Sequence, residues 1–310
     1  MKSRVLTLKD PKSVDFSPYL EPFVLDQERL NHELNRIANP YIRWENGTTL
    51  FSGDMAVCRL KSDCPRFNKE SIRFVAGSGL FHRELEALAV GMTVGETRQI
   101  DLPEGRVALT LTQVTNKIVP EISDEMVEKL GLEGIHTVAD YTAYLTVQQK
   151  EETFQKRVYE PLNYLIRQVI DNSEFVLYQA DWQHVVDLRL EWNRALTRRE
   201  GMTLETMTEK EFEGRMPVKC YDELVALEQR EAWNNLCMHL LGRCFAQKQG
   251  FQPDQSGYEA SLQNYSNSWG ISQEEARELE PYESYAFFAY SNLAYQTLYD
   301  IVKQKYFKED

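Results

Sequence analysis

The hydrophobic pattern of this chain shifts from strand-like to helical spacing at about residue 120, and this shift separates two architectures. Between residues 44 and 118 the apolar runs are short, and the run 107–114 alternates strictly, with Val107, Leu109 and Leu111 on one face. After Pro120 the apolar spacing becomes helical and remains so to the end of the sequence. We therefore expect an α+β chain in which a small sheet-containing unit precedes an extended all-α region.

The sheet-containing unit has four clear strand signals. They are MAVCRL (55–60), SIRFV (71–75), TRQIDL (97–102) and VALTLTQV (107–114). A short helix is expected at 82–90, and an amphipathic helix at 24–37 ends at Asn39-Pro40. We predict three parts: an N-terminal segment with a connecting helix at 1–43, a sheet domain at 44–118 and a helical domain at 119–310.

The helical region is expected to begin with a long helix that starts at Thr137 and is interrupted by Pro161. A second stripe recurs at helical spacing from Tyr178 to Leu196. The last 60 residues hold 13 of the 35 aromatic residues, about twice the average density. These aromatics either fill the seam between two long helices or face outward as an adhesive apolar surface.

Composition excludes several classes of protein. Apolar residues make up 42% and charged residues 27% of the chain, which is typical of a globular protein. No apolar run is long enough to span a membrane, and the first residues lack the apolar stretch of a signal peptide, so we expect a cytoplasmic protein. The formal charge of −13 disfavours binding to nucleic acid. Five scattered cysteines without a CxxC do not form a disulfide framework.

Signatures of catalysis are missing. The sequence has no GxGxxG after a strand, no GxxxxGK[ST], no GxSxG and no HExxH. The five histidines have no partner at ligand spacing, so we expect neither a metal site nor a cofactor. The acidic runs 274–275 and 278–280 are interpreted as solvated helix faces.

Two segments carry a resemblance to a known family. The segment FVAGSGLFHRELEALAVGMTVGETRQIDLP (74–103) resembles the centre of FKBP-type peptidyl-prolyl isomerases, with a strand, a GxG turn, a short helix and a Gly-Met-x-x-Gly-Glu turn. The segment VPEISDEMVEKLG (119–131) resembles the junction that follows the isomerase domain in the trigger factor family, and FVLYQADWQHVVDLRLEWNRAL (175–196) lies where that family has an arm helix. The resemblance implies an antiparallel FKBP-like sheet followed by the helical arms of a chaperone.

Departures from the family pattern qualify what the resemblance implies. The Gly-Phe-Arg-x-Gly-Lys loop with which the family docks on the ribosome is missing, so docking by that loop is not expected. The isomerase pocket falls on Leu60, Phe67, Asn68, Ile72, Phe81, His82, Leu85 and Leu109. Its floor position, usually aromatic, is Leu85, and only Glu-Gly-Arg separates Pro103 from Val107 where the family has a long flap. Because an isomerase must enclose the X-Pro amide, we expect weak or absent activity.

Three hypotheses remain open at this point. The first is a trigger-factor-like chaperone that binds unfolded or nascent polypeptides through apolar arm surfaces. The second is a working prolyl isomerase, and the third is a helical scaffold that assembles with itself. For the first, the candidate client-binding residues are Trp182, Trp192, Trp233, Tyr285, Phe287, Phe288 and Tyr290.

Overall fold

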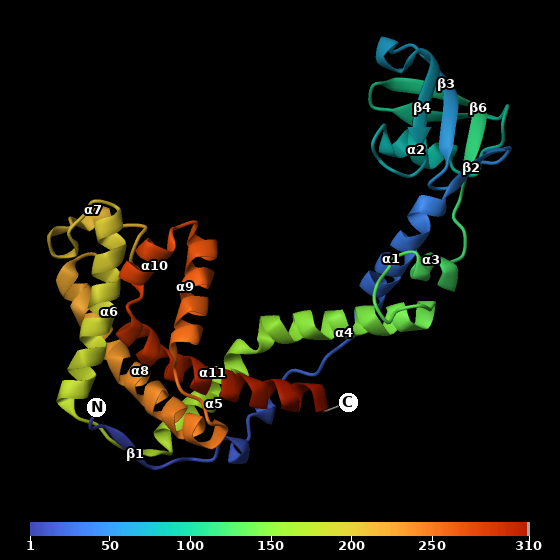
Figure 1. Ribbon diagram of the computed structural model, residues 1–310. Helices are drawn as coiled ribbons and strands as arrows, with labels where there is room; N and C mark the ends of the chain where they lie inside the picture. The colour runs from blue at the N-terminus through green and yellow to red at the C-terminus, as the bar shows by residue number, and fades with distance from the viewer. Residues whose placement is uncertain (309–310) are drawn as a thin grey trace. The chain divides into compact units, whose positions relative to one another are not determined.

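The computed structural model describes residues 1–308, which form two units (Figure 1). The sheet unit is Val24–Lys150. The helical unit combines Met1–Phe23 with the chain from Glu151 onward. In the sequence, the sheet unit is therefore inserted between two pieces of the helical unit.

The sheet unit is built around one long central strand. Its elements are α1 (Gln27–Ala38), β2 (Arg43–Gly47), β3 (Met55–Ser62), β4 (Lys69–Val75), α2 (Arg83–Ala89), β5 (Thr97–Leu102), β6 (Gly105–Ile118) and α3 (Asp124–Glu128). Every pairing is antiparallel. Strand β6 pairs with β2 and β5 along one side and with β3 along the other, and β4 pairs with β3. This arrangement confirms the expected α+β class.

The alternation of β6 explains where the core of the sheet unit lies. Val107, Leu109 and Leu111 are buried, whereas Thr112 on the opposite face is exposed. Helix α2 adds Leu85 and Ala89 to the same core. The four strands and the short helix expected from the sequence are all present, with bounds that differ by no more than a few residues.

The helical unit contains one short strand pair and a set of helices. Its elements are β1 (Arg4–Thr7), α5 (Tyr159–Asp171), β7 (Glu174–Val176), α6 (Gln179–Arg199), α7 (Glu209–Phe212), α8 (Tyr221–Gln249), α9 (Gln255–Trp269), α10 (Gln273–Leu279) and α11 (Tyr282–Lys308). Helix α4 (Val138–Arg157) runs from the sheet unit into the helical unit, and α5 begins two residues after α4 ends. Pro161 lies in the first turn of α5, where its missing N–H costs no helical hydrogen bond, so the interruption expected at this proline is confirmed.

The first residues of the chain complete the helical unit. Strand β1 pairs antiparallel with β7, with Arg4 opposite Val176. Phe16 is buried in a cluster with Phe154, Leu162 and residues of α8 and α11. The sequence pattern predicted neither strand, because each has only three or four residues.

Helices α8 and α11 approach each other closely at Gly242. A Cβ atom at this position would overlap the backbone carbonyl of Tyr290 on α11. Around this crossing α11 buries Phe287, Ala289 and Ala294, while Tyr282 and Tyr295 are exposed. The aromatic residues of α11 therefore divide between core and surface, and neither of the two readings of the sequence covers them all.

Candidate functional site

Half of the eight residues predicted to form the isomerase groove are buried in the core of the sheet unit. Leu60, Phe67, Leu85 and Leu109 are buried in its core. Ile72, Phe81 and His82 are half-buried, and Asn68 is exposed. These positions include two aromatic contacts. The His82 ring meets Phe67 edge-on with centroids 5.4 Å apart, and Phe81 stacks on Phe74 with centroids 5.5 Å apart.

Glu86 holds the loop that carries Phe81 and His82. The Glu86 carboxylate accepts hydrogen bonds from Ser78 Oγ and from the backbone N–H groups of Gly79, Phe81 and His82, over 2.6 to 3.2 Å. Burial acts to raise the pKa of this carboxyl, but these four hydrogen bonds outweigh it and hold the pKa below its usual range. The loop is thereby fixed by the Glu86 carboxylate, each of whose two oxygens accepts two hydrogen bonds.

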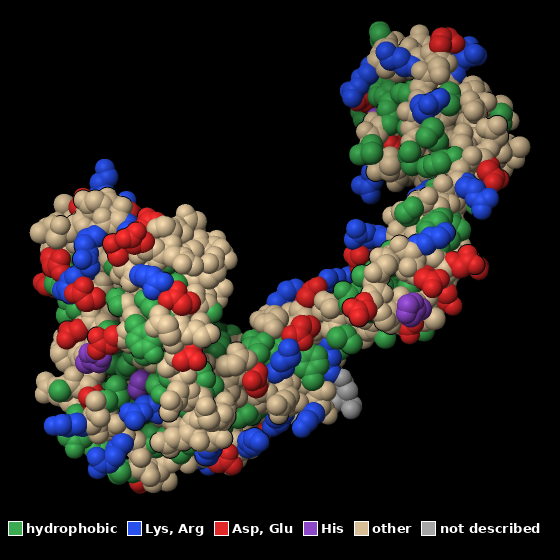
Figure 2. Space-filling model, viewed as in Figure 1, with side chains coloured by type: hydrophobic (Ala, Val, Ile, Leu, Met, Phe, Trp, Pro, Cys, Tyr) green, Lys and Arg blue, Asp and Glu red, His purple; other side chains and the backbone are tan. Residues whose placement is uncertain are grey.

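The connection expected to lack a flap is a tight hairpin. Leu102 of β5 pairs with Gly105 of β6, so only Pro103 and Glu104 join the two strands. Apolar side chains are nevertheless exposed elsewhere on this unit, and Figure 2 shows a group of them on its visible face. The most exposed is Leu80, at 90%, in the loop that Glu86 holds. This surface can contact an apolar segment but has no lid to enclose it.

The seven candidate client-binding aromatics lie in different surroundings within the helical unit. Trp182, Trp192, Tyr285, Phe288 and Tyr290 are half-buried, and Trp233 is 43% exposed. Phe287 is only 4% exposed. Its ring stacks on His239 with centroids 4.2 Å apart, and its carbonyl oxygen lies 3.0 Å from His239 Nδ1. The expectation that Phe287 could meet a client is therefore wrong, because it lies at the core of the α8–α11 seam.

Two of the candidates, Trp192 and Phe288, line the same cavity of about 310 Å³ between α6, α8, α9 and α11. We call this cavity the aromatic–acidic cleft. Its lining consists of Arg189, Trp192, Asn193, Glu228, Tyr265, Glu280, Ser284, Phe288 and Asn292. A cavity of this size with aromatic walls and a few converging polar groups is typical of a binding site.

The charges of the aromatic–acidic cleft are unequally satisfied. Glu228 is buried, forms an ion pair with Arg189 and accepts a hydrogen bond of 3.0 Å from Asn193 Nδ2. Glu280 is 9% exposed, and its carboxylate accepts one hydrogen bond, 2.6 Å from Ser261 Oγ. Burial raises the pKa of Glu280 despite this hydrogen bond, because a single neutral donor does not replace the lost hydration.

Helix α9 positions Glu280 from two directions. The hydroxyl of Tyr258 donates to the Glu280 backbone carbonyl at 2.7 Å, while Ser261 holds the side chain. Both donors lie on α9, and Glu280 itself caps the C-terminal end of α10. The expectation that residues 278–280 form a solvated face is wrong for Glu280. The only signal in the sequence that sets Glu280 apart is its place between Leu279 and Pro281, where α10 ends.

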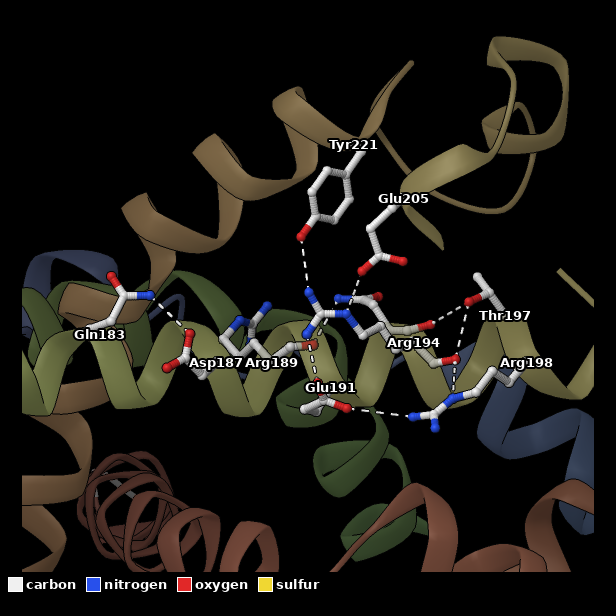
Figure 3. Close-up of polar contacts among 10 residues, drawn as sticks. Gln183, Asp187, Arg189, Glu191, Arg194, Thr197, Arg198, Glu205 and Tyr221 are labelled. Carbon is white, nitrogen blue, oxygen red and sulfur yellow. Dashed lines mark hydrogen bonds and ion pairs between the residues drawn. The ribbon is translucent and has the colours of Figure 1, made fainter. Parts of the chain in front are cut away.

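A polar network fixes the neighbouring part of α6. Figure 3 shows Arg194 of α6 between Glu191, Glu205 and Tyr221. The pKa of Arg194 is raised, chiefly by its hydrogen bond to Glu205. Because Tyr221 begins α8 and Glu205 lies in the segment before α7, this arginine ties both to the helix that carries Trp192. The hydrogen bonds of Arg194 therefore fix the position of α6, the helix that contributes Trp192 to the cleft.

Comparison with known proteins adds a relationship to this geometry. No protein-family model matches the chain. It is 24% identical over 211 residues to the trigger factor of Mesoplasma florum, in an alignment covering 64% of this chain and 48% of that protein. This is a trigger-factor-like protein. It spans about half the length of the curated trigger factor that it matches.

A solved structure of the trigger factor chaperone, from work on promiscuous substrate recognition in folding and assembly, also matches. The match has a TM-score of 0.39 and 15% sequence identity, and covers 98% of this chain and 73% of that chain. A score this low does not establish a shared arrangement of the whole chain, so the likeness to trigger factor rests on the sequence. 

Two further properties concern residues 1–308 only. None of their helices combines the length and apolarity needed to cross a membrane. Nor do they bring together three or more His, Cys, Asp or Glu side chains in a way that could hold a metal ion.

Proposed function

We propose that this protein is a chaperone that binds unfolded or nascent polypeptides through apolar surfaces of its helical unit. The observation that carries the proposal is the aromatic–acidic cleft, where Trp192 and Phe288 are only half-buried and line a cavity. Because burying an aromatic side chain is worth about 1.5–3 kcal/mol, accessible aromatics in a braced cavity are best explained by binding. Similarity to trigger factor supports the same activity.

The proposed client is an extended apolar segment of a polypeptide in the cytoplasm. Acidic and basic side chains intermix over the visible face of the helical unit (Figure 2), and the chain as a whole carries a formal charge of −13. A charged exterior of this kind keeps a protein with accessible aromatics in solution. We do not propose docking on the ribosome by the family loop, nor binding to nucleic acid.

An aggregation assay tests the proposal. The double variant Trp192→Ser, Phe288→Ser is expected to suppress aggregation of a heat-unfolded client less well than the unaltered protein, while its melting temperature changes little. The matched control is Tyr159→Ser, which removes an aromatic that is 76% exposed on α5 and lies outside the cleft. Equal suppression by both variants would rule out the cleft as the client site. Loss of self-association alone would favour the scaffold hypothesis.

For the sheet unit we propose an FKBP-like domain over residues 44–118 with little or no isomerase activity. Leu85 stands at the pocket floor and a two-residue hairpin replaces the flap, so an X-Pro amide would remain solvated. In a proline-limited refolding assay we expect no rate enhancement comparable to that of an intact FKBP enzyme. Should residual activity exist, Phe67→Ala and Phe81→Ala are expected to remove it, and a rate near that of the intact enzyme would overturn this part of the proposal.

A further inference from the structure

We propose that the aromatic–acidic cleft binds an organic cation, namely a guanidinium or ammonium group on an aliphatic chain. The inference concerns the same cleft as the proposed function but rests on its charges. The two charged partners Glu228 and Arg189 neutralise each other, while Glu280 faces the cavity without a cationic partner among residues 1–308. With its acidic groups ionised, the lining has two carboxylates and one guanidinium, which leaves one negative charge in excess.

The surroundings of Glu280 suit a cation that also has apolar surface. Trp192, Tyr265 and Phe288 all line the cavity with Glu280, and aromatic faces attract cations through their quadrupole. Tyr265 is close enough to Glu280 for electrostatic influence: burial raises the pKa of its phenol, and the Glu280 carboxylate adds to this effect. An aliphatic stem could lie against the rings while its charged end reaches the free side of the Glu280 carboxylate.

Other ligand classes fit less well. A hard metal ion such as Ca²⁺ requires six to eight oxygen ligands, whereas Glu228 is already occupied by Arg189 and Asn193. An anion would meet the excess negative charge, because the only guanidinium of the lining is paired with Glu228. The cavity of about 310 Å³ has room for a small organic ligand or one long side chain.

Calorimetric titration of the full chain with propylguanidinium, and with propylurea as its neutral analogue, tests the proposal. Propylguanidinium is expected to bind, and propylurea is expected to bind at least about tenfold more weakly because it lacks the charge. Failure of propylguanidinium to bind, or equal binding of both compounds, would overturn the proposal.

Variants locate the site. Glu280→Gln preserves the shape of the side chain and is expected to weaken propylguanidinium binding about tenfold or more. Glu278→Gln is the matched control, because it removes the same charge from an exposed position two residues away and should leave binding unchanged. Equal affinities in the two variants would show that Glu280 does not hold the cation.

A competition experiment assigns the source of the cation. A short peptide containing arginine displaces propylguanidinium if the site accepts a side chain of a polypeptide, whereas the same peptide with citrulline should not. If propylguanidinium binds but the arginine peptide does not displace it, the site takes free small cations. Both results support the site. Because aggregation is not measured here, the cation site and the chaperone proposal can each fail alone.

Discussion

Glu86 in the sheet unit and Glu280 in the helical unit are both buried, yet their environments shift the pKa in opposite directions. Glu86 accepts four hydrogen bonds, and its pKa is lowered. Glu280 accepts one side-chain hydrogen bond, and its pKa is raised. Four hydrogen-bond donors outweigh the cost of burial at Glu86, whereas a single donor does not outweigh it at Glu280.

The same contrast extends to the neighbourhood of each glutamate. Around Glu86 the predicted groove residues Leu60, Leu85 and Leu109 are packed into a filled core. Around Glu280 the helices leave a cavity lined by Trp192 and Phe288. A buried carboxylate with four hydrogen-bond donors, such as Glu86, has little left to offer a ligand, whereas Glu280, with one donor, can gain by binding one.

The largest expected effect tests whether Phe287 belongs to the packed core while its neighbour Phe288 belongs to the cleft. Phe287→Ala should lower the free energy of unfolding of the helical unit by about 3–5 kcal/mol, because it empties a buried site against His239. Phe288→Ala, in the cleft, should cost much less. Urea unfolding followed by tryptophan fluorescence measures both, since four of the five tryptophans lie in the helical unit. Similar costs for the two variants would refute the distinction between core and cleft.

Acid should weaken the helical unit before the sheet unit. Burial lowers the pKa of His239 from 6.5 to about 4, so the unfolded state binds more protons between these values. Stability is then lost as the pH falls through this window, by up to about 3 kcal/mol. The stability from Glu86 is present above the usual pKa of 4.5 and is lost only at lower pH. Unfolding curves at several pH values measure this order, and His239→Gln should flatten the response of the helical unit.

A smaller loss is expected for Glu86→Gln. At pH 7 the change should lower the stability of the sheet unit by about 2 kcal/mol, because the amide nitrogen cannot accept the N–H groups that one carboxylate oxygen accepts. Amide hydrogen exchange at Gly79 and Phe81 should report the loosened loop. Unchanged exchange at these two amides would contradict the role given to Glu86.

The smallest effect has the opposite sign. Glu280→Gln should raise the stability of the helical unit at pH 7 by about 1 kcal/mol, because it removes a buried charge with a single donor. Between the usual pKa of 4.5 and the raised pKa in the folded state, the folded protein binds more protons, so stability falls as the pH rises. The gain should therefore vanish below pH 4.5. If Glu280→Gln instead lowered the stability at pH 7, the claim that ionised Glu280 weakens the fold while Glu86 stabilises it would be wrong.

The sequence predicts those parts of the fold that local pattern determines. The alternation of Val107, Leu109 and Leu111 sets the buried face of β6, and Pro161 sets the break between α4 and α5. The pairing of β1 with β7 was not predicted, because it joins two very short segments that are far apart in the sequence. Such a pairing depends on the tertiary fold and leaves almost no periodic signal.

The candidate site was predicted only in part, for a related reason. Trp192 and Phe288 were found from helical spacing. Phe287 was chosen because it lies off that stripe and adds apolar surface to the helix, but its burial depends on where α8 crosses α11. Glu280 was missed because an acidic run looks solvated until α9 is placed beside it. Spacing identifies a helix face, and only the packing of its neighbours shows which members remain accessible.

The insertion of the sheet unit between two pieces of the helical unit has a consequence for the time course of synthesis. Strand β1 stays unpaired until the chain from residue 8 to residue 176 has been translated, which takes roughly ten to thirty seconds at typical elongation rates. During that wait the sheet unit is complete and can fold, since its strands pair only with one another. The edge of β1 has no partner until β7 emerges, and the cluster around the ring of Phe16 is incomplete until α8 and α11 emerge. During most of its synthesis the protein therefore has an unpaired strand, β1, and an incompletely buried aromatic side chain, Phe16.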